Sequence, residues 1–149
     1  MIRNLFLVGA AVMVILCGCQ NTAPSDSRSP APPAVSLTDR QWNLTALHGT
    51  PIVPADVPDH APHITFVSKD NSLAGAASVN RFFGTWSNEG GKLSVKPMGM
   101  SMMAGPEPLM KQEQAFMKAL STVTGYRIEG KTLTLLAGEH NVATLTAAE

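Results

Sequence analysis

The chain carries little charge, and what it carries is balanced. Charged residues make up 15% of its 149 residues, and 11 basic side chains face 11 acidic ones, so the net charge is +0. Proteins that bind nucleic acid carry a basic patch or a strongly positive balance, so this composition argues against such a partner. Hydrophobic residues reach 44%, which is too many for a disordered chain. The length suits one domain of ordinary size.

Cysteine is nearly absent, because Cys17 and Cys19 are the only two in the chain. The chain after residue 19 therefore has no thiol for a disulfide, a thiolate metal site or a cysteine nucleophile. It also lacks the Gly-x-Ser-x-Gly, Ser-x-x-Lys, phosphate-loop and His-Glu-x-x-His motifs. Acidic residues are scattered singly, without the pairing that a glycosidase needs. The sequence thus predicts a protein that is not an enzyme and has no cofactor.

Residues 1–18 are predicted to form a lipoprotein signal peptide. A basic start with Arg3 precedes an apolar run over residues 5–16, which is too short to span a bilayer. The run ends in Leu-Cys-Gly-Cys at residues 16–19, which resembles the lipobox of bacterial lipoproteins. The alternative is an ordinary secretory signal with two incidental cysteines.

The lipobox resemblance implies that Cys19 carries the lipid. Stable anchoring takes at least two acyl signals, and a multiply acylated cysteine meets that condition. By resemblance to sorted lipoproteins, Gln20 in place of aspartate predicts an outer-membrane location with the domain facing the periplasm. Residues 19–35, rich in proline and serine, are predicted to be a tether, and residues 36–149 the domain.

Within that domain the hydrophobic pattern is mostly that of strands. Alternating segments predict strands at residues 41–47, 63–67, 72–79, 92–96, 126–128, 133–135 and 142–145. One amphipathic helix is expected after Pro106, with Phe116 and Leu120 on its apolar face and Gly125 as its stop. The predicted fold class is mostly β (α+β): a small antiparallel barrel-like or strongly curved sheet with one helix.

Three short stretches of the predicted domain stand out. They are Trp42-x-Leu44-x-x-Leu47-x-Gly49, Gly75-Ala76-Ala77-Ser78-Val79-Asn80-Arg81-Phe82-Phe83-Gly84 and Ser101-Met102-Met103-Ala104-Gly105-Pro106. In this order they resemble the META domain family, which includes the heat-shock protein HslJ. The resemblance implies a barrel-like β domain and a setting of envelope stress, and it implies no catalytic residues.

The chain departs from the family at two positions. The two cysteines of the family fall at Val79 and Gly105, so both are absent here. Loss of both together is typical of a structural pair, because one orphan thiol is a liability in an oxidising compartment. Whether the stress role of the family survives without them is open at this point.

The run Asn80-Arg81-Phe82-Phe83-Gly84 has two interpretations. Asparagine tolerates a left-handed backbone and Gly84 permits a bend, so we expect a turn whose two phenylalanines fold inward. The alternative is a recognition loop formed by Asn80, Arg81, Phe82 and Phe83.

Four methionines, Met98, Met100, Met102 and Met103, lie within six residues. The favoured interpretation is core packing, because methionine fills irregular cores. One alternative is a copper or silver site, since soft thioethers at this spacing suit Cu(I) and an extended strand would place Met98, Met100 and Met102 on one face. Another is a surface for an apolar ligand or a protein partner.

His60 and His63 form a weaker candidate metal pair in a proline-rich loop, where we expect solvated residues. Taken together, the sequence predicts a lipid-anchored envelope protein with a non-catalytic binding or stress-maintenance role. Its partners would be the membrane, through Cys19, and a protein or small apolar ligand. An acyl chain inside the barrel is a further hypothesis. The alternative function is Cu(I) or Ag(I) binding by the methionines.

Overall fold

The structure is a computed structural model that describes residues 35–54 and 60–149. The predicted signal peptide, Cys19 and the predicted tether up to residue 34 lie outside the described residues. Across the described ranges, no helix has both the length and the apolar character needed to cross a membrane.

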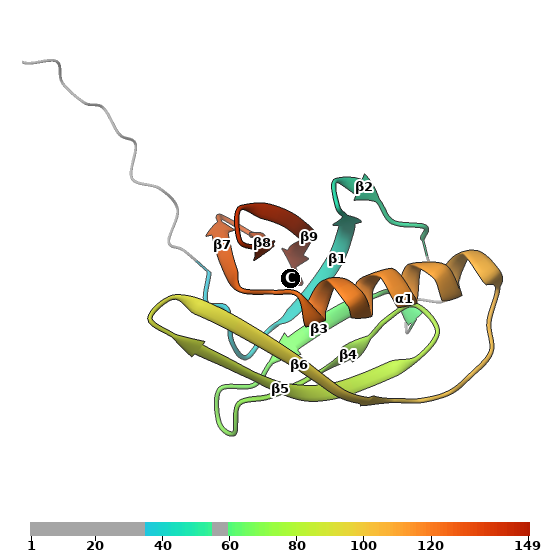
Figure 1. Ribbon diagram of the computed structural model, residues 1–149, viewed down its shortest axis with the longest axis horizontal. Coiled ribbons are helices and arrows are strands. Elements are labelled where there is room, and N and C mark those ends of the chain that lie inside the picture. The colour runs from blue at the N-terminus through green and yellow to red at the C-terminus, as the bar shows by residue number, and fades with distance from the viewer. Residues whose placement is uncertain (1–34, 55–59) are drawn as a thin grey trace, which may run out of the picture.

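Nine strands form one strongly curled antiparallel sheet, and a single α-helix of the described chain lies at its open side (Figure 1). The strands are β1 (Gln41–Leu47), β2 (Thr50–Pro51), β3 (His63–Phe66), β4 (Ser72–Ala76), β5 (Arg81–Glu89), β6 (Lys92–Met100), β7 (Gly125–Glu129), β8 (Thr132–Ala137) and β9 (His140–Ala147). Their order is β6-β5-β4-β3-β1-β9-β8-β7, with β2 paired to β1. The predicted fold class, a mostly β curved sheet with one helix, is confirmed.

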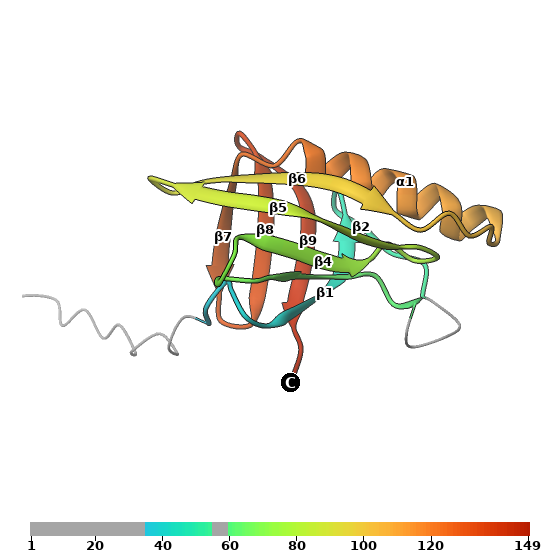
Figure 2. The ribbon, with the colours of Figure 1, turned by 90° about the horizontal axis from the view of Figure 1, so that it is seen from below.

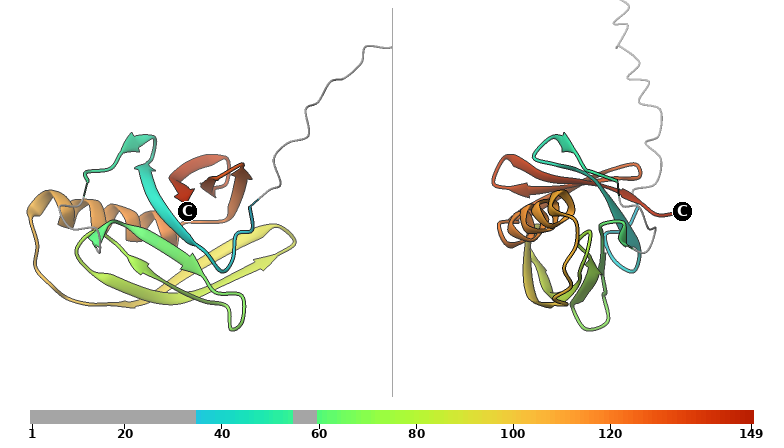
Figure 3. Two further views of the ribbon diagram at one scale, coloured as in Figure 1. Left: turned by 180° about the vertical axis from the view of Figure 1, so that it is seen from behind. Right: turned by 90° about the vertical axis from the view of Figure 1, so that its right-hand side faces the viewer.

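The sheet closes about halfway into a barrel, with the helix α1 (Glu107–Ser121) beside the gap between its edge strands (Figures 2 and 3). Asn88 of β5 links to Tyr126 of β7 by a hydrogen bond from Asn88 Nδ2 to the tyrosine hydroxyl at 3.3 Å. The helix contacts β6, β9 and β1. Helix and sheet therefore enclose one common core.

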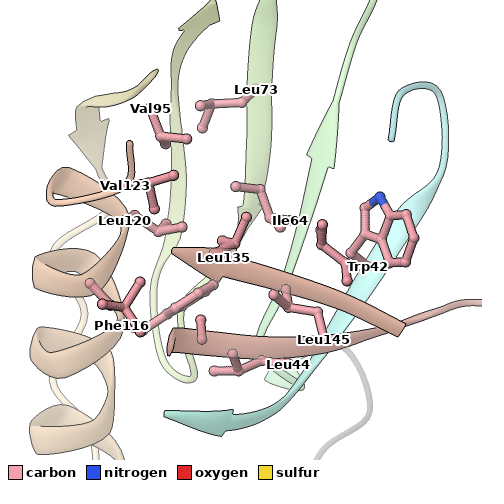
Figure 4. Packing of buried hydrophobic residues seen from close by; sticks show 14 of the residues in the cluster. Trp42, Leu44, Ile64, Leu73, Val95, Phe116, Leu120, Val123, Leu135 and Leu145 are labelled. Atoms are coloured by element: carbon pink, nitrogen blue, oxygen red, sulfur yellow. The ribbon is translucent and has the colours of Figure 1, made fainter. Parts of the chain in front are cut away.

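Alternate residues of the strands point into that core, as the sequence pattern predicted. In Figure 4, Phe116 and Leu120 of α1 point toward Leu135 and Leu145 of the sheet. The ring of Phe116 meets that of Phe82 edge to face, with centroids 6.0 Å apart. The space between sheet and helix is thus filled by apolar side chains.

The chain enters the domain through a segment that is held firmly. The buried indole of Trp42 donates a hydrogen bond from Nε1 to the carbonyl of Leu37 at 2.8 Å. Asp39 accepts the backbone N–H of Ser68 at 2.9 Å and its hydroxyl at 2.6 Å. These two hydrogen bonds, the backbone one first, hold the pKa of Asp39 below its ordinary value.

Residues 35–40 enter toward one end of the domain, and the connection from β6 to α1 lies at the other (Figures 1 and 3).

The helix begins as predicted but ends earlier. Pro106 precedes its first residue, and Glu107 lies at the positive end of the helix dipole. The predicted stop at Gly125 was wrong, because the helix ends at Ser121 and Gly125 begins β7. Thr122 ends the helix by donating its N–H (3.1 Å) and its hydroxyl (2.8 Å) to the carbonyl of Ala119.

The turn predicted at residues 80–84 was also wrong. The turn lies at residues 77–80, closed by a hydrogen bond from Ala77 N to the carbonyl of Asn80 at 2.8 Å, and β5 starts at Arg81. Because side chains alternate along a strand, Phe82 is buried while Phe83 is 58% exposed, so only one of the two rings folds inward.

The expectation that the methionine cluster packs into the core was wrong as well. Met98 is 67% exposed and Met102 is 96% exposed, and Met100 and Met103 are also exposed. The strand β6 ends at Met100, so Met98, Met100 and Met102 do not share one face of a single strand. The cluster lies on the surface because the chain leaves the sheet there to reach the helix.

Candidate functional site

A surface groove of about 500 Å³, called the methionine groove below, lies where β6 ends and α1 begins. One wall is formed by residues 100–104, and the other by the first half of α1. Its lining residues are Asn80, Met100, Ser101, Met102, Met103, Ala104, Met110, Glu113 and Gln114. Four of these nine are methionines, so the groove surface is chiefly thioether and methyl groups.

Asn80 fixes one wall of the groove. Its side chain is 2% exposed and donates from Nδ2 to the carbonyl of Met103 at 3.1 Å and to Glu113 Oε1 at 2.8 Å. Its Oδ1 accepts the hydroxyl of Ser101 at 2.9 Å and the backbone N–H of Met103 at 2.7 Å. All four hydrogen-bonding positions of the amide are therefore used. The main chain at Met103 is held on both its N–H and its carbonyl.

Glu113 lies beneath the groove as a buried carboxylate that is 3% exposed. Its Oε2 accepts the backbone N–H of Val79 at 3.2 Å and that of Asn80 at 2.7 Å. Its three partners are all donors, an arrangement that suits the ionised carboxylate, which only accepts. Glu113 thus ties the turn between β4 and β5 to the helix, with no positive side chain among these partners.

Gln112, the neighbouring helix residue, ties a third segment to α1. Its Oε1 accepts the backbone N–H of Val53 at 2.6 Å, and its Nε2 donates to the Val53 carbonyl at 3.1 Å and to the Ser78 hydroxyl at 3.0 Å. Ser78 is fully buried and has a positive φ of 123°. Two adjacent polar residues of the helix therefore hold the loop at Val53 and the turn at residues 78–80 against its first half.

The structure separates the four residues of the predicted recognition loop. Asn80 supports the groove and Phe82 enters the core, whereas Arg81 and Phe83 lie on the outer surface. The Phe83 ring lies over Gly99, where an added Cβ would be 2.7 Å from it. These four side chains do not form one recognition surface.

The predicted metal candidates also separate. Met100, Met102 and Met103 line the groove, and Met98 does not. His63 is half-buried, and its Nδ1 lies 2.8 Å from the carbonyl of Ala61. No group of three or more His, Cys, Asp or Glu side chains suited to a metal is found within residues 35–54 and 60–149.

Val79 and Gly105 lie against each other, although 26 positions separate them in the chain. A Cβ built on Gly105 would be 3.4 Å from the Val79 Cβ and 2.7 Å from its Cγ2. Glycine at 105 therefore leaves room for the valine methyl groups.

The comparison with protein families agrees with this fold. The model of the META domain matches residues 35–149. The chain belongs to the META domain family. Its resemblance to that family, drawn from three short stretches, is thereby confirmed. The contact between Val79 and Gly105 also shows that the two positions at which the resemblance placed cysteines are neighbours in the fold.

Solved structures share the META domain fold at low identity. A protein from Burkholderia xenovorans, solved by NMR, is 22% identical with a TM-score of 0.59, over 83% of this chain and 96% of that one. A DUF4847 family protein from Bacteroides vulgatus is 16% identical with a TM-score of 0.57, over 76% and 94%. No match was found among curated proteins.

Sequence reasoning missed Gln112 and Glu113, the two helix residues that organise the site. A signal was available, because Glu113 lies four residues after Leu109 and three before Phe116, on the apolar stripe of the helix. A carboxylate on such a stripe is buried only when hydrogen bonds compensate it. Its partners come from distant segments, so only the structure names them.

Proposed function

We propose that this META domain protein is a lipid-anchored protein of the outer membrane whose domain faces the periplasm and binds a small apolar ligand in the methionine groove. The role is one of binding and of envelope-stress maintenance, without catalysis. One observation carries the proposal: methionines are exposed on a segment that the buried side chain of Asn80 holds in place.

The chemistry of the groove supports an apolar ligand. The side-chain amide of Asn80 is fully used within the protein, and the carboxylate of Glu113 accepts three internal hydrogen bonds. A ligand therefore gains from contact with thioethers and methyl groups, which adapt to varied shapes. The volume of about 500 Å³ lies within the range of small-molecule sites.

Native mass spectrometry tests the binding role. We expect mature protein, residues 19–149 with Cys19 replaced by serine and exported to the periplasm behind an ordinary cleavable secretory signal, to carry excess mass the size of a small organic molecule. This excess should disappear on denaturation. Substitution of Ala104 by aspartate, which puts a charge in the apolar lining, should remove the excess mass. A native mass equal to the denatured mass contradicts the small-ligand proposal and favours a protein partner.

Lipid anchoring has its own test. In cells treated with globomycin, which inhibits the lipoprotein signal peptidase, we expect the protein to accumulate with residues 1–18 attached. Replacing Cys19 with serine should likewise prevent both cleavage after residue 18 and labelling with a palmitate analogue. Normal processing in the presence of globomycin contradicts the lipoprotein proposal.

A further inference from the structure

We propose that the methionine groove is also a binding site for a soft monovalent cation, Cu(I) or Ag(I), held by the thioethers of Met100, Met102 and Met103 with Met110 as a fourth donor. The proposal uses the same groove as the proposed function but does not require that an apolar ligand binds there. It departs from the sequence hypothesis in its ligands, since Met110 enters the set and Met98 leaves it.

The four methionines reach the groove from three parts of the fold. Met100 ends β6, Met102 and Met103 belong to the segment that follows, and Met110 lies in the first half of α1. Three of the four are exposed, which is unusual for a side chain that normally fills cores. All four therefore line one concave surface.

The donor type selects the ion. Neutral thioethers suit soft ions such as Cu(I), whereas hard ions such as Mg²⁺ and Ca²⁺ prefer several oxygens. The carboxylate of Glu113 is the one acidic group among the lining residues, and its oxygens accept three internal hydrogen bonds. It does not offer the oxygen-rich shell of a hard ion.

The charge of the groove also suits a cation. Glu113 contributes a buried negative charge, and no lysine, arginine or histidine is found among the residues that line the groove. Lys111, the nearest lysine along α1, is not among the lining residues, and its Nζ lies 2.6 Å from Glu107 Oε1 in an ion pair. A monovalent cation bound by neutral sulfur would therefore be drawn to the groove by this charge.

The segment that carries the donors is already ordered. Asn80 holds both the N–H and the carbonyl of Met103, and Ser101 N donates to the Arg81 carbonyl at 2.9 Å. Binding then requires rotation of flexible side chains and no reordering of the main chain, which lowers its entropic cost.

The test compares Ag(I) binding to matched variants. The protein is residues 19–149 with Cys19→Ser, so that no thiol competes, and silver nitrate is titrated calorimetrically in chloride-free buffer. We expect one bound ion, and an affinity about 100-fold weaker in the triple variant Met100→Leu, Met102→Leu, Met103→Leu. The variant Met98→Leu removes an exposed methionine outside the groove and should bind as the parent does. Competition with bicinchoninate for Cu(I) should give the same ranking.

Equal affinity in the parent and the triple variant overturns the metal site, as does an equal loss in the Met98→Leu control. Leucine keeps the size and apolar character of methionine, and the three positions are exposed, so the triple variant should fold. An apolar ligand should therefore remain bound to it in native mass spectrometry. If the triple variant loses Ag(I) binding and the parent carries no excess mass in native mass spectrometry, the metal site is supported. That result contradicts only the apolar ligand.

Discussion

Replacing Glu113 with alanine should lower the free energy of unfolding by about 3–5 kcal/mol, measured by urea denaturation followed by tryptophan fluorescence. The loss follows from the position of the carboxylate, because its removal leaves the backbone N–H groups of Val79 and Asn80 and one N–H of the Asn80 side chain without acceptors in the interior. Amide hydrogen exchange should then quicken at Met103, since Asn80 holds that residue.

Two further variants separate hydrogen bonding from packing at this site. Glu113→Gln has nearly the same shape but turns an NH₂ group toward Asn80 Nδ2, so it should destabilise the fold less than alanine yet measurably. Gln114→Ala, at the adjacent exposed position of the helix, should change stability by no more than about 0.5 kcal/mol. A similarly small effect of Glu113→Ala would mean that water replaces the carboxylate and that the network does not organise the site.

The paired substitution Val79→Cys and Gly105→Cys should form a disulfide and raise the free energy of unfolding by about 3 kcal/mol. The Cβ built on Gly105 is 3.4 Å from the Val79 Cβ, close to the separation found in disulfides. Gly105 does not have a positive φ, so its backbone accepts a side chain. Mass spectrometry should show the loss of two hydrogens, and denaturation with and without reductant should show the gain.

The single variants give the control for this pair. Gly105→Cys alone places its Cβ 2.7 Å from the Val79 Cγ2, which is too close, so the variant should be less stable than the parent. Replacing the valine by cysteine removes that methyl group and the clash with it. If both thiols of the double variant stay free after mild oxidation, the arrangement of these two residues is contradicted.

Much of the fold was predictable because its strands alternate. The buried face of β1 is marked by Trp42 and Leu44, and that of β3 by Ile64 and Phe66. The strands predicted at these two places are confirmed. The helix start was predictable too, since a proline can precede a first turn but cannot continue a helix. These signals lie within single segments of the chain, so they can be recognised in one sequence without knowledge of the fold.

What failed depended on contacts between distant segments. The turn was placed at residues 80–84 on the tolerance of Asn80 for left-handed backbone, whereas it lies at residues 77–80 and its residue with positive φ is Ser78. The side chain of Asn80 instead holds residues 101–103, which are far away in the sequence. The methionines were assigned to the core on their apolar character, because nothing local shows that β6 ends at Met100 and the chain then leaves the sheet. The composition of a segment gives its chemistry, whereas its surroundings in the fold decide whether its side chains are buried or exposed.

The entering chain and the groove lie at opposite ends of the domain, and this bears on how a ligand could approach an anchored protein. Residues 35–40 join the domain toward one end, and the β6–α1 connection that forms the groove lies at the other (Figure 1). With Cys19 as the proposed anchor, the groove lies at the end of the domain opposite to the one where the chain enters. On that proposal, the methionines would be open to a molecule diffusing in the aqueous compartment, which would not need to enter the bilayer first.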